Sequence, residues 1–116
     1  MARIKPSQRE KKRYIVFRID SEEVLSFDEV MNALTQACLR FIGEFGFEKT
    51  RLFVIRNMYE PESKRGIFRV TNKSIESIKM ILPLIDSING KKARMSIIGV
   101  SGILKKAKNK FLINRQ

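Results

Sequence analysis

The sequence contains no histidine, no tryptophan and a single cysteine, Cys38. Without histidine it lacks the side chain that most often serves as a general base or a metal ligand near neutral pH. One cysteine excludes an internal disulfide, and the apolar, helix-spaced surroundings of Cys38 are typical of a small buried side chain. Glycine-rich phosphate loops and nucleophile-elbow motifs are absent as well. We therefore predict no catalytic residue, no metal site and no cofactor held by the protein itself.

Long hydrophobic runs are also absent. No stretch reaches the roughly eighteen apolar residues that a membrane-spanning helix requires, and the N-terminus has no apolar signal core. The 116 residues are enough for one domain with a modest core. We expect a soluble, cytoplasmic, single-domain protein without a membrane partner. Three clustered acids, Asp20, Glu22 and Glu23, leave a metal-dependent nuclease as a weak alternative, because solvated carboxylates are ordinary in a turn.

Positive charge dominates the sequence, with 24 basic residues against 12 acidic ones and a net charge of +12. The excess lies at the two ends: residues 1–13 carry six basic residues and one acid, and residues 102–116 carry five basic residues and no acid. This distribution is typical of a protein that binds a polyanion. Nucleic acid is favoured over an anionic membrane, because neither end has the aromatic apolar face of an interfacial helix. We expect a basic tail (1–12), a folded domain (13–101) and a basic C-terminal helix and tail (102–116).

Residues rich in β-formers predict four strands, at 14–20, 50–56, 65–71 and 93–101. Helices are predicted between the first two strands and between the last two, and a third follows residue 102. The order β-α-β-β-α-β predicts an α+β fold of the split β-α-β type, which is ferredoxin-like or RRM-like. Such a fold has a four-stranded antiparallel sheet with two helices on one face, and here it carries an extra C-terminal helix.

Each predicted helix has its own signals. Ser26 and Glu29 form a capping box, and apolar residues then recur with a 3.6-residue period as far as Gly46, the expected end. The second helix is predicted over 74–88 with a kink or break at Pro83, which cannot donate a helical hydrogen bond. After residue 102, a narrow apolar arc surrounded by lysines predicts a basic amphipathic helix.

Alternation along the strands separates two faces of the sheet. The face expected to meet the two helices consists of Ile15, Phe17, Ile19, Phe53, Ile55, Phe68, Val70, Met95 and Ile97. The opposite face mixes arginines with aliphatic side chains and offers almost no aromatic ring, so we expect it not to stack bases. It should be covered by the third helix and a protein partner. The partner-binding residues predicted on it are Val16, Leu52, Val54, Ile67 and Ile98.

RNA contacts are then expected to be made by phosphate-binding side chains. The segment 64–70, Lys-Arg-Gly-Ile-Phe-Arg-Val, fills the place of the RNA-reading strand of an RNA recognition motif, but Ile67 and Arg69 replace its stacking aromatics. Binding should therefore follow RNA shape and depend strongly on salt. The predicted RNA-binding residues are Lys11, Lys12, Arg13, Lys64, Arg65, Arg69, Lys105, Lys106, Lys108 and Lys110.

Four short motifs occur in order along the chain: KKRY at 11–14, GEFG at 43–46, RGIFR at 65–69 and IGVSG at 98–102. In this order, and over about residues 13–110, they resemble the archaeal ribonuclease P protein component 2 family. The resemblance implies a subunit of the enzyme that removes 5′ leaders from precursor tRNA, in which Mg²⁺ on the RNA supports RNA catalysis.

The same resemblance implies the partners. They are ribonuclease P RNA, ribonuclease P protein component 3, other ribonuclease P proteins and, indirectly, precursor tRNA, with a homodimer of this chain as a further option inside the complex. The protein's role would be to relieve phosphate repulsion, so that the RNA folds at lower Mg²⁺. The alternative is a ribosome-associated or general structured-RNA-binding protein.

Overall fold

The computed structural model describes residues 11–113, with side chains as far as Asn109. Its helices and strands are β1 (Lys12–Ser21), α1 (Phe27–Thr50), β2 (Phe53–Val54), β3 (Arg65–Thr71), α2 (Ile75–Ile81), β4 (Ser87–Ile88), β5 (Lys91–Ser101) and α3 (Leu104–Ile113). Short 3₁₀ helices, η2 (Arg56–Met58), η3 (Asn72–Ser74) and η4 (Leu82–Leu84), connect some of them.

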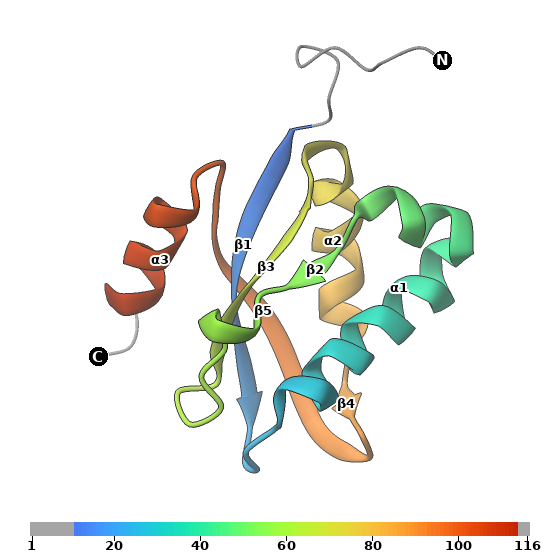
Figure 1. Ribbon diagram of the computed structural model, residues 1–116. Coiled ribbons are helices and arrows are strands. Elements are labelled where there is room, and N and C mark those ends of the chain that lie inside the picture. Colours follow the sequence, from blue (N-terminus) through green and yellow to red (C-terminus); the bar gives the residue numbers. More distant parts are fainter. Residues whose placement is uncertain (1–10, 114–116) are drawn as a thin grey trace, which may run out of the picture.

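The strands form one antiparallel sheet in the order β2-β3-β1-β5-β4. Helices α1 and α2 cover one face, and α3 lies against the other (Figure 1). The predicted α+β class and the extra C-terminal helix are confirmed. The predicted count of four strands is wrong, because the described chain contains a fifth strand, β4, at the edge next to β5.

The fifth strand comes from residues that were predicted to be helical. Helix α2 ends at Ile81 and continues only as the 3₁₀ helix η4, so the predicted break at Pro83 is confirmed. Residues 87–88 then pair with 91–92 across a two-residue turn in which Asn89 (φ 53°) and Gly90 (φ 79°) are both left-handed. Such a turn matches the twist of a tight hairpin. The last part of the predicted second helix is therefore a hairpin strand.

Helix α1 begins as predicted. The Glu29 amide donates to Ser26 Oγ (3.2 Å), and the Ser26 amide donates to Glu29 Oε1 (3.0 Å), which completes the capping box. Leu25 and Val30, on either side of the cap, are both buried in the core, in the positions of a hydrophobic staple. The local sequence therefore fixes where this helix starts and which side faces the sheet.

The end of α1 differs from the prediction. Gly43 (φ 73°, ψ 179°) kinks the helix, which then resumes and runs to Thr50, where Arg51 adopts the left-handed cap conformation. The expected end at Gly46 is wrong, because the left-handed break falls at Gly43 and Gly46 lies within the resumed helix. The kink turns the apolar stripe outward, so that the Phe45 side chain is 83% exposed.

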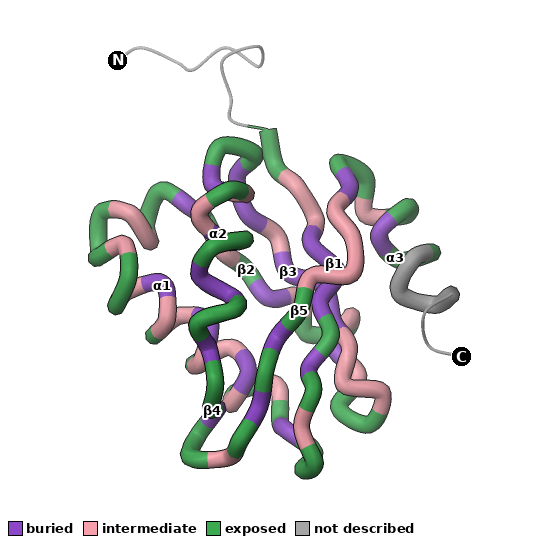
Figure 2. The backbone as a smooth tube through the Cα atoms, turned by 180° about the vertical axis from the view of Figure 1, so that it is seen from behind, coloured by how far each residue is buried: buried purple, intermediate pink, exposed green. Residues whose placement is uncertain are grey.

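The inner core consists of buried side chains from the sheet and from helices α1 and α2, and Figure 2 marks buried positions along these elements. Gly66 lies beneath the Phe17 and Tyr59 rings, and a Cβ atom on it would be 2.7 Å from Phe17 Cζ. The buried Tyr59 hydroxyl donates to the Leu25 carbonyl (2.5 Å), and burial raises the pKa of Tyr59 to about 12. Cys38 is also buried, which raises the pKa of its thiol to about 11 and matches the predicted structural role.

A smaller outer cluster lies on the other face, under α3. Its fully buried members are Val16, Ile67 and Ala107. A β-bulge shapes this region: Val16 pairs with Gly99 and Phe17 pairs with Ile97, which leaves Ile98 as an extra residue. The extra residue lets Ile98 join the outer cluster while Val100 packs against the inner core. Uninterrupted alternation along 93–101 predicts that Val100 shares the outer face with Ile98, and the bulge makes that prediction wrong.

The faces predicted for residues 50–56 are inverted. Leu52 and Val54 pack with the inner core, and Ile55 joins the outer cluster. Thr50, expected to start this strand, is instead the last residue of α1, so the alternation begins later and in the opposite phase. Phe53 consequently lies opposite Arg69 of β3 and is exposed.

Candidate nucleic-acid interface

Helix α3 presents a basic surface. Leu104 and Ala107 face the outer cluster, whereas Lys105, Lys106 and Lys108 are exposed. The Ile103 amide donates to Ser101 Oγ (3.1 Å), which fixes the turn from β5 into the helix. The predicted amphipathic helix is confirmed, and its polar surface carries positive charge. The side chain of Lys110 lies outside the described residues.

The start of β1 lies beside the start of α3. Tyr14 pairs with Ser101, the last residue of β5. Arg13 donates from Nε to Asn72 Oδ1 (2.9 Å), and its guanidinium group lies 3.2 Å from the position that a Cβ of Gly102 would occupy. Lys11 and Lys12 are exposed next to it. The strand register therefore brings together two basic groups that are about ninety residues apart in the sequence. We call the surface that they form the basic end; its residues are Lys11, Lys12, Arg13, Lys105, Lys106 and Lys108.

Lys64 and Arg65 lie at the opposite end of the sheet. The β1–β3 ladder runs from the Lys12–Thr71 pair to the Arg18–Arg65 pair, a separation of roughly 20 Å at about 3.3 Å per residue. Lys64 Nζ donates to the Ser21 carbonyl, which ties this lysine to the end of β1. Arg65 Nη1 is buried and has no hydrogen-bond partner within the described residues. The structure thus divides the predicted RNA-binding residues between two places.

Arg69 lies between these two places, on the outer face. It pairs with Tyr14 on one side and with Phe53 on the other. Its guanidinium carbon is 5.2 Å from the centroid of the Phe53 ring, and its Nε atom is buried without a hydrogen-bond partner in the described chain. Sequence reasoning placed Phe53 on the wrong face. Glu48 and Lys49 are good helix formers, and they were a weak signal that α1 continues and that the strand starts later.

The structure also corrects the predicted partner-binding residues. Val16 and Ile67 are fully buried beneath α3, and Ile98 is half-buried beside them. Leu52 and Val54 face the inner core, on the side of α1 and α2. These five residues therefore do not form an open docking surface, because α3 covers the outer ones and the domain's own helices cover the rest.

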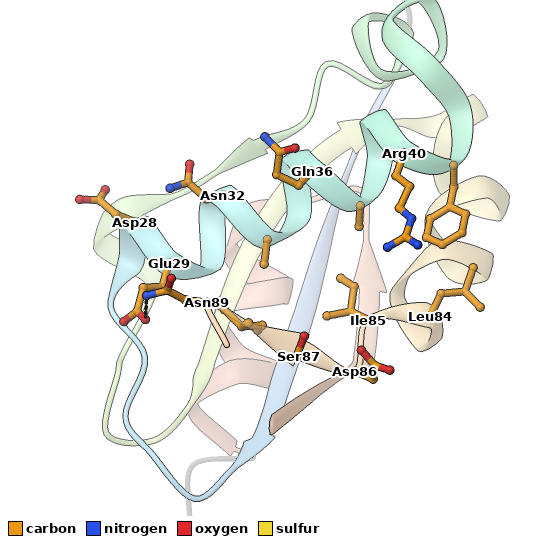
Figure 3. Close-up of a pocket in the computed structure, with 14 residues that line it drawn as sticks. Asp28, Glu29, Asn32, Gln36, Arg40, Leu84, Ile85, Asp86, Ser87 and Asn89 are labelled. Atoms are coloured by element: carbon orange, nitrogen blue, oxygen red, sulfur yellow. Dashed lines mark hydrogen bonds between the residues drawn. The ribbon is translucent and has the colours of Figure 1, made fainter. Parts of the chain in front are cut away.

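Large exposed hydrophobic side chains gather elsewhere, around α1 and η4. Figure 3 shows a groove in which Arg40 of α1 faces Leu84 and Ile85, and in which Phe41 also takes part. The exposed fractions are 46% for Phe41 and 54% for Leu84. Contiguous exposed apolar side chains of this kind commonly mark protein interfaces.

At the other end of this groove, Glu29 joins α1 to the β4–β5 hairpin. Besides the Ser26 amide, it accepts a hydrogen bond from Asn89 Nδ2 (2.9 Å; Figure 3) and another from Lys91 Nζ (3.2 Å). The hydrogen bond from the Ser26 amide has the largest effect, and together with those from Asn89 and Lys91 it holds the pKa of Glu29 at about 2, below its ordinary 4.5. The carboxylate therefore connects the start of α1 to the β4–β5 hairpin.

Residues 11–113 contain neither a cluster of metal-binding side chains nor a membrane-spanning helix. No group of three or more histidine, cysteine, aspartate or glutamate side chains is placed to hold a metal ion. Within the same range, no helix combines the length and apolar character needed to cross a membrane.

Comparison with known proteins identifies relatives over most of the chain. The profile of the Rpp14/Pop5 family matches residues 13–112. Ribonuclease P protein component 2 of Pyrococcus furiosus is 38% identical over 107 residues, which cover 92% of this chain and 88% of that protein. Proteins of the same name from Thermococcus gammatolerans and Methanocaldococcus jannaschii are 40% and 36% identical; each alignment covers 92% of this chain, and they cover 88% and 77% of those proteins.

A solved structure supports the same fold. A chain in the cryo-EM structure of yeast ribonuclease MRP superposes with a TM-score of 0.66 and 18% sequence identity, covering 82% of this chain and 76% of that one. At this identity the likeness concerns the fold alone.

Proposed function

The chain belongs to the Rpp14/Pop5 family, and from this premise we infer that it is a protein subunit of ribonuclease P. Its relatives at 36–40% identity are named ribonuclease P protein component 2 and align with almost the whole chain. As part of this ribonucleoprotein it takes part in the processing of tRNA. The RNA, with its own Mg²⁺, supplies the catalysis, and the protein supplies binding surfaces; a cytoplasmic location remains a prediction.

The basic end is the proposed RNA contact. The observation that carries this proposal is the pairing of Tyr14 with Ser101, because it brings Lys11, Lys12 and Arg13 next to the exposed lysines of α3. A continuous basic surface can neutralise several phosphates of a folded RNA and release their counterions. The repulsion that opposes RNA folding is then reduced, so the catalytic RNA reaches its active fold at lower Mg²⁺.

Protein contacts are proposed for the α1 surface. Phe41, Phe45 and Leu84 are exposed apolar side chains there, and Arg40 adds a group suited to interfaces. This surface replaces the sheet residues that the sequence had suggested. Ribonuclease P protein component 3 is the first candidate partner, and a second copy of this chain is the other.

The salt dependence of RNA binding tests the proposed RNA contact. If the basic end neutralises about six phosphates, the slope of log affinity against log salt should be roughly −4 to −5. Replacing Lys105, Lys106 and Lys108 by alanine should flatten that slope by about 2. The matched control replaces Arg40, Lys79 and Lys92, which are equally exposed but lie on α1, α2 and the β4–β5 hairpin. Equal slopes for the two triple variants would contradict the assignment of α3.

A Mg²⁺ titration tests the functional role. Ribonuclease P RNA, assayed on precursor tRNA with the other protein subunits present, should require less Mg²⁺ when this chain is included. A Mg²⁺ requirement that does not change would reject the proposed mechanism. The purified chain alone should not cleave precursor tRNA, and cleavage in the absence of RNA would show an active site of its own. A general structured-RNA-binding protein would instead help unrelated RNAs equally.

A further inference from the structure

The outer face of the sheet carries a partly open edge beside α3. Val16 and Ile67, near the middle of the face, are fully covered, but Phe53 on the edge strand β2 remains 54% exposed. Val54, the next residue, points into the inner core, so Phe53 must point to the side of α3. The helix therefore closes the centre of this face and leaves an aromatic ring accessible at its margin.

Three side chains follow one another across the strands at this margin. Tyr14 of β1 pairs with Arg69 of β3, and Arg69 pairs with Phe53 of β2, so all three lie side by side on the same face. Tyr14 is half-buried against the outer cluster, and the Arg69 guanidinium lies against the Phe53 ring at 5.2 Å from its centroid. The row offers two aromatic rings and one planar cation, which are the groups that stack on nucleobases.

Arg69 also has unused hydrogen-bonding capacity. Its Nε atom is buried and has no partner in the described chain. A buried donor without an acceptor is uncommon in a folded protein and calls for an explanation such as a missing ligand. The Nε atom is closed to solvent, so an acceptor from a ligand would reach it only after a shift of the Arg69 side chain.

The surroundings of the row favour an anionic ligand. Lys12, two residues before Tyr14 on the same side of β1, is exposed and pairs with Thr71. The exposed lysines belong to α3, which packs on this same face. No ion pair joins Arg69 or Lys12 to an acid among the described residues. The charge of this margin is therefore available to a ligand.

We propose that Tyr14, Arg69 and Phe53 form a stacking site for one unpaired nucleotide of the bound RNA. The base stacks on the exposed Phe53 ring, Arg69 donates to the base edge or to its phosphate, and Lys12 contacts the neighbouring phosphate. The site rests on the proposed RNA-binding function and refines it, because it adds a contact with single-stranded nucleotides to a surface otherwise devoted to phosphates. A stacking site of this kind favours unpaired over paired RNA.

The test uses the full chain and an eight-nucleotide single-stranded RNA that contains 2-aminopurine, with a blunt RNA duplex as the second probe. Phe53→Leu keeps an apolar side chain but removes the π surface. It should weaken binding of the single strand by about 5- to 100-fold and abolish quenching of 2-aminopurine. Duplex binding and the salt slope should stay unchanged, because no phosphate contact is lost. Met80→Leu, at an exposed apolar side chain of α2, is the control and should bind like the wild type.

The outcomes separate this site from the broader proposal. If Phe53→Leu binds the single strand as tightly as the wild type while the α3 triple lysine variant does not, the stacking site is wrong and the RNA contact stands. If the wild-type chain binds neither probe nor ribonuclease P RNA, the proposed function itself fails. Loss of binding to protein component 3 with unchanged RNA binding would assign Phe53 to a protein interface and overturn the site. An unchanged thermal unfolding midpoint verifies that Phe53→Leu is folded.

Discussion

The two faces of the sheet differ in what their side chains contact. On the inner face, the Phe17 ring lies against both Phe68 and Tyr59, and α1 and α2 cover this side of the sheet. On the outer face, only a few small or branched side chains are buried under α3, and arginines, lysines and an exposed phenylalanine surround them. Because successive strand residues point to opposite faces, neighbours such as Phe68 and Arg69 serve different purposes. The inner face forms the main core of the domain, and the outer face keeps charged side chains and one aromatic ring exposed at its margin.

The largest expected effect comes from truncating the inner face. Phe17→Ala should lower the free energy of unfolding by about 3–5 kcal/mol, because the ring is fully buried among other rings. Ile67→Ala, on the outer face, should cost about 2 kcal/mol, since α3 can settle onto the smaller side chain. Urea denaturation of both variants measures the difference. Equal losses would show that the outer cluster is as much a part of the core as the inner one.

Replacing a glycine by alanine on each side of the sheet compares the same two faces, with smaller expected effects on stability. A Cβ at Gly66 would lie 2.7 Å from Phe17 Cζ, so Gly66→Ala should cost about 1–3 kcal/mol through displaced rings. A Cβ at Gly102 would meet only the end of the Arg13 side chain, at 3.2 Å. That side chain can move, and Gly102→Ala should change stability by less than about 0.5 kcal/mol. Thermal unfolding distinguishes them, and a large loss at Gly102 would contradict this account of the outer face.

The smallest expected effect on stability concerns the hydrogen bonds of Glu29 that connect α1 to the β4–β5 hairpin. The pKa of Glu29 is about 2 in the folded protein against an ordinary 4.5, so its stabilisation is complete above about pH 4.5 and is lost as the pH falls toward 2. Glu29→Gln should therefore unfold at a lower temperature than the wild type at pH 7, and the gap should close between pH 4.5 and 2. Glu76→Gln, which removes an exposed 3.8 Å ion pair with Lys79, is the control and should show almost no gap.

Local signals predicted the parts of the fold that depend on local chemistry. The capping box at Ser26, the break at Pro83 and the amphipathic α3 are each encoded within a few residues, and each is confirmed. The faces of residues 50–56 could not be obtained this way, because they depend on where α1 ends, and the helix continues past a kink that no local rule placed at Gly43. Because side chains alternate between the two faces, that one error in the helix boundary put every residue of the strand on the wrong face.

The candidate site was predicted in composition but not in arrangement. The basic residues at both ends of the chain were identified, and their meeting at one end of the sheet depends on the pairing of Tyr14 with Ser101. The separation of Lys64 and Arg65 from that end follows from the length of the β1–β3 ladder. Phe53 was missed as a surface ring because its face was inverted, and no residue pattern showed that α3 would leave it exposed.

The bulge at Ile98 has a consequence for how this chain can change in length. Ile98 is the residue that β5 has in excess of its partner, since Val16 pairs with Gly99 and Phe17 with Ile97. Deleting Ile98 would make those two pairs adjacent and would keep Ser101 on the face from which α3 departs. Deleting a paired residue such as Met95 would instead move every later side chain of the strand to the wrong face. A one-residue deletion is thus absorbed at this single point of the strand, at the expense of one apolar contact beneath the last helix.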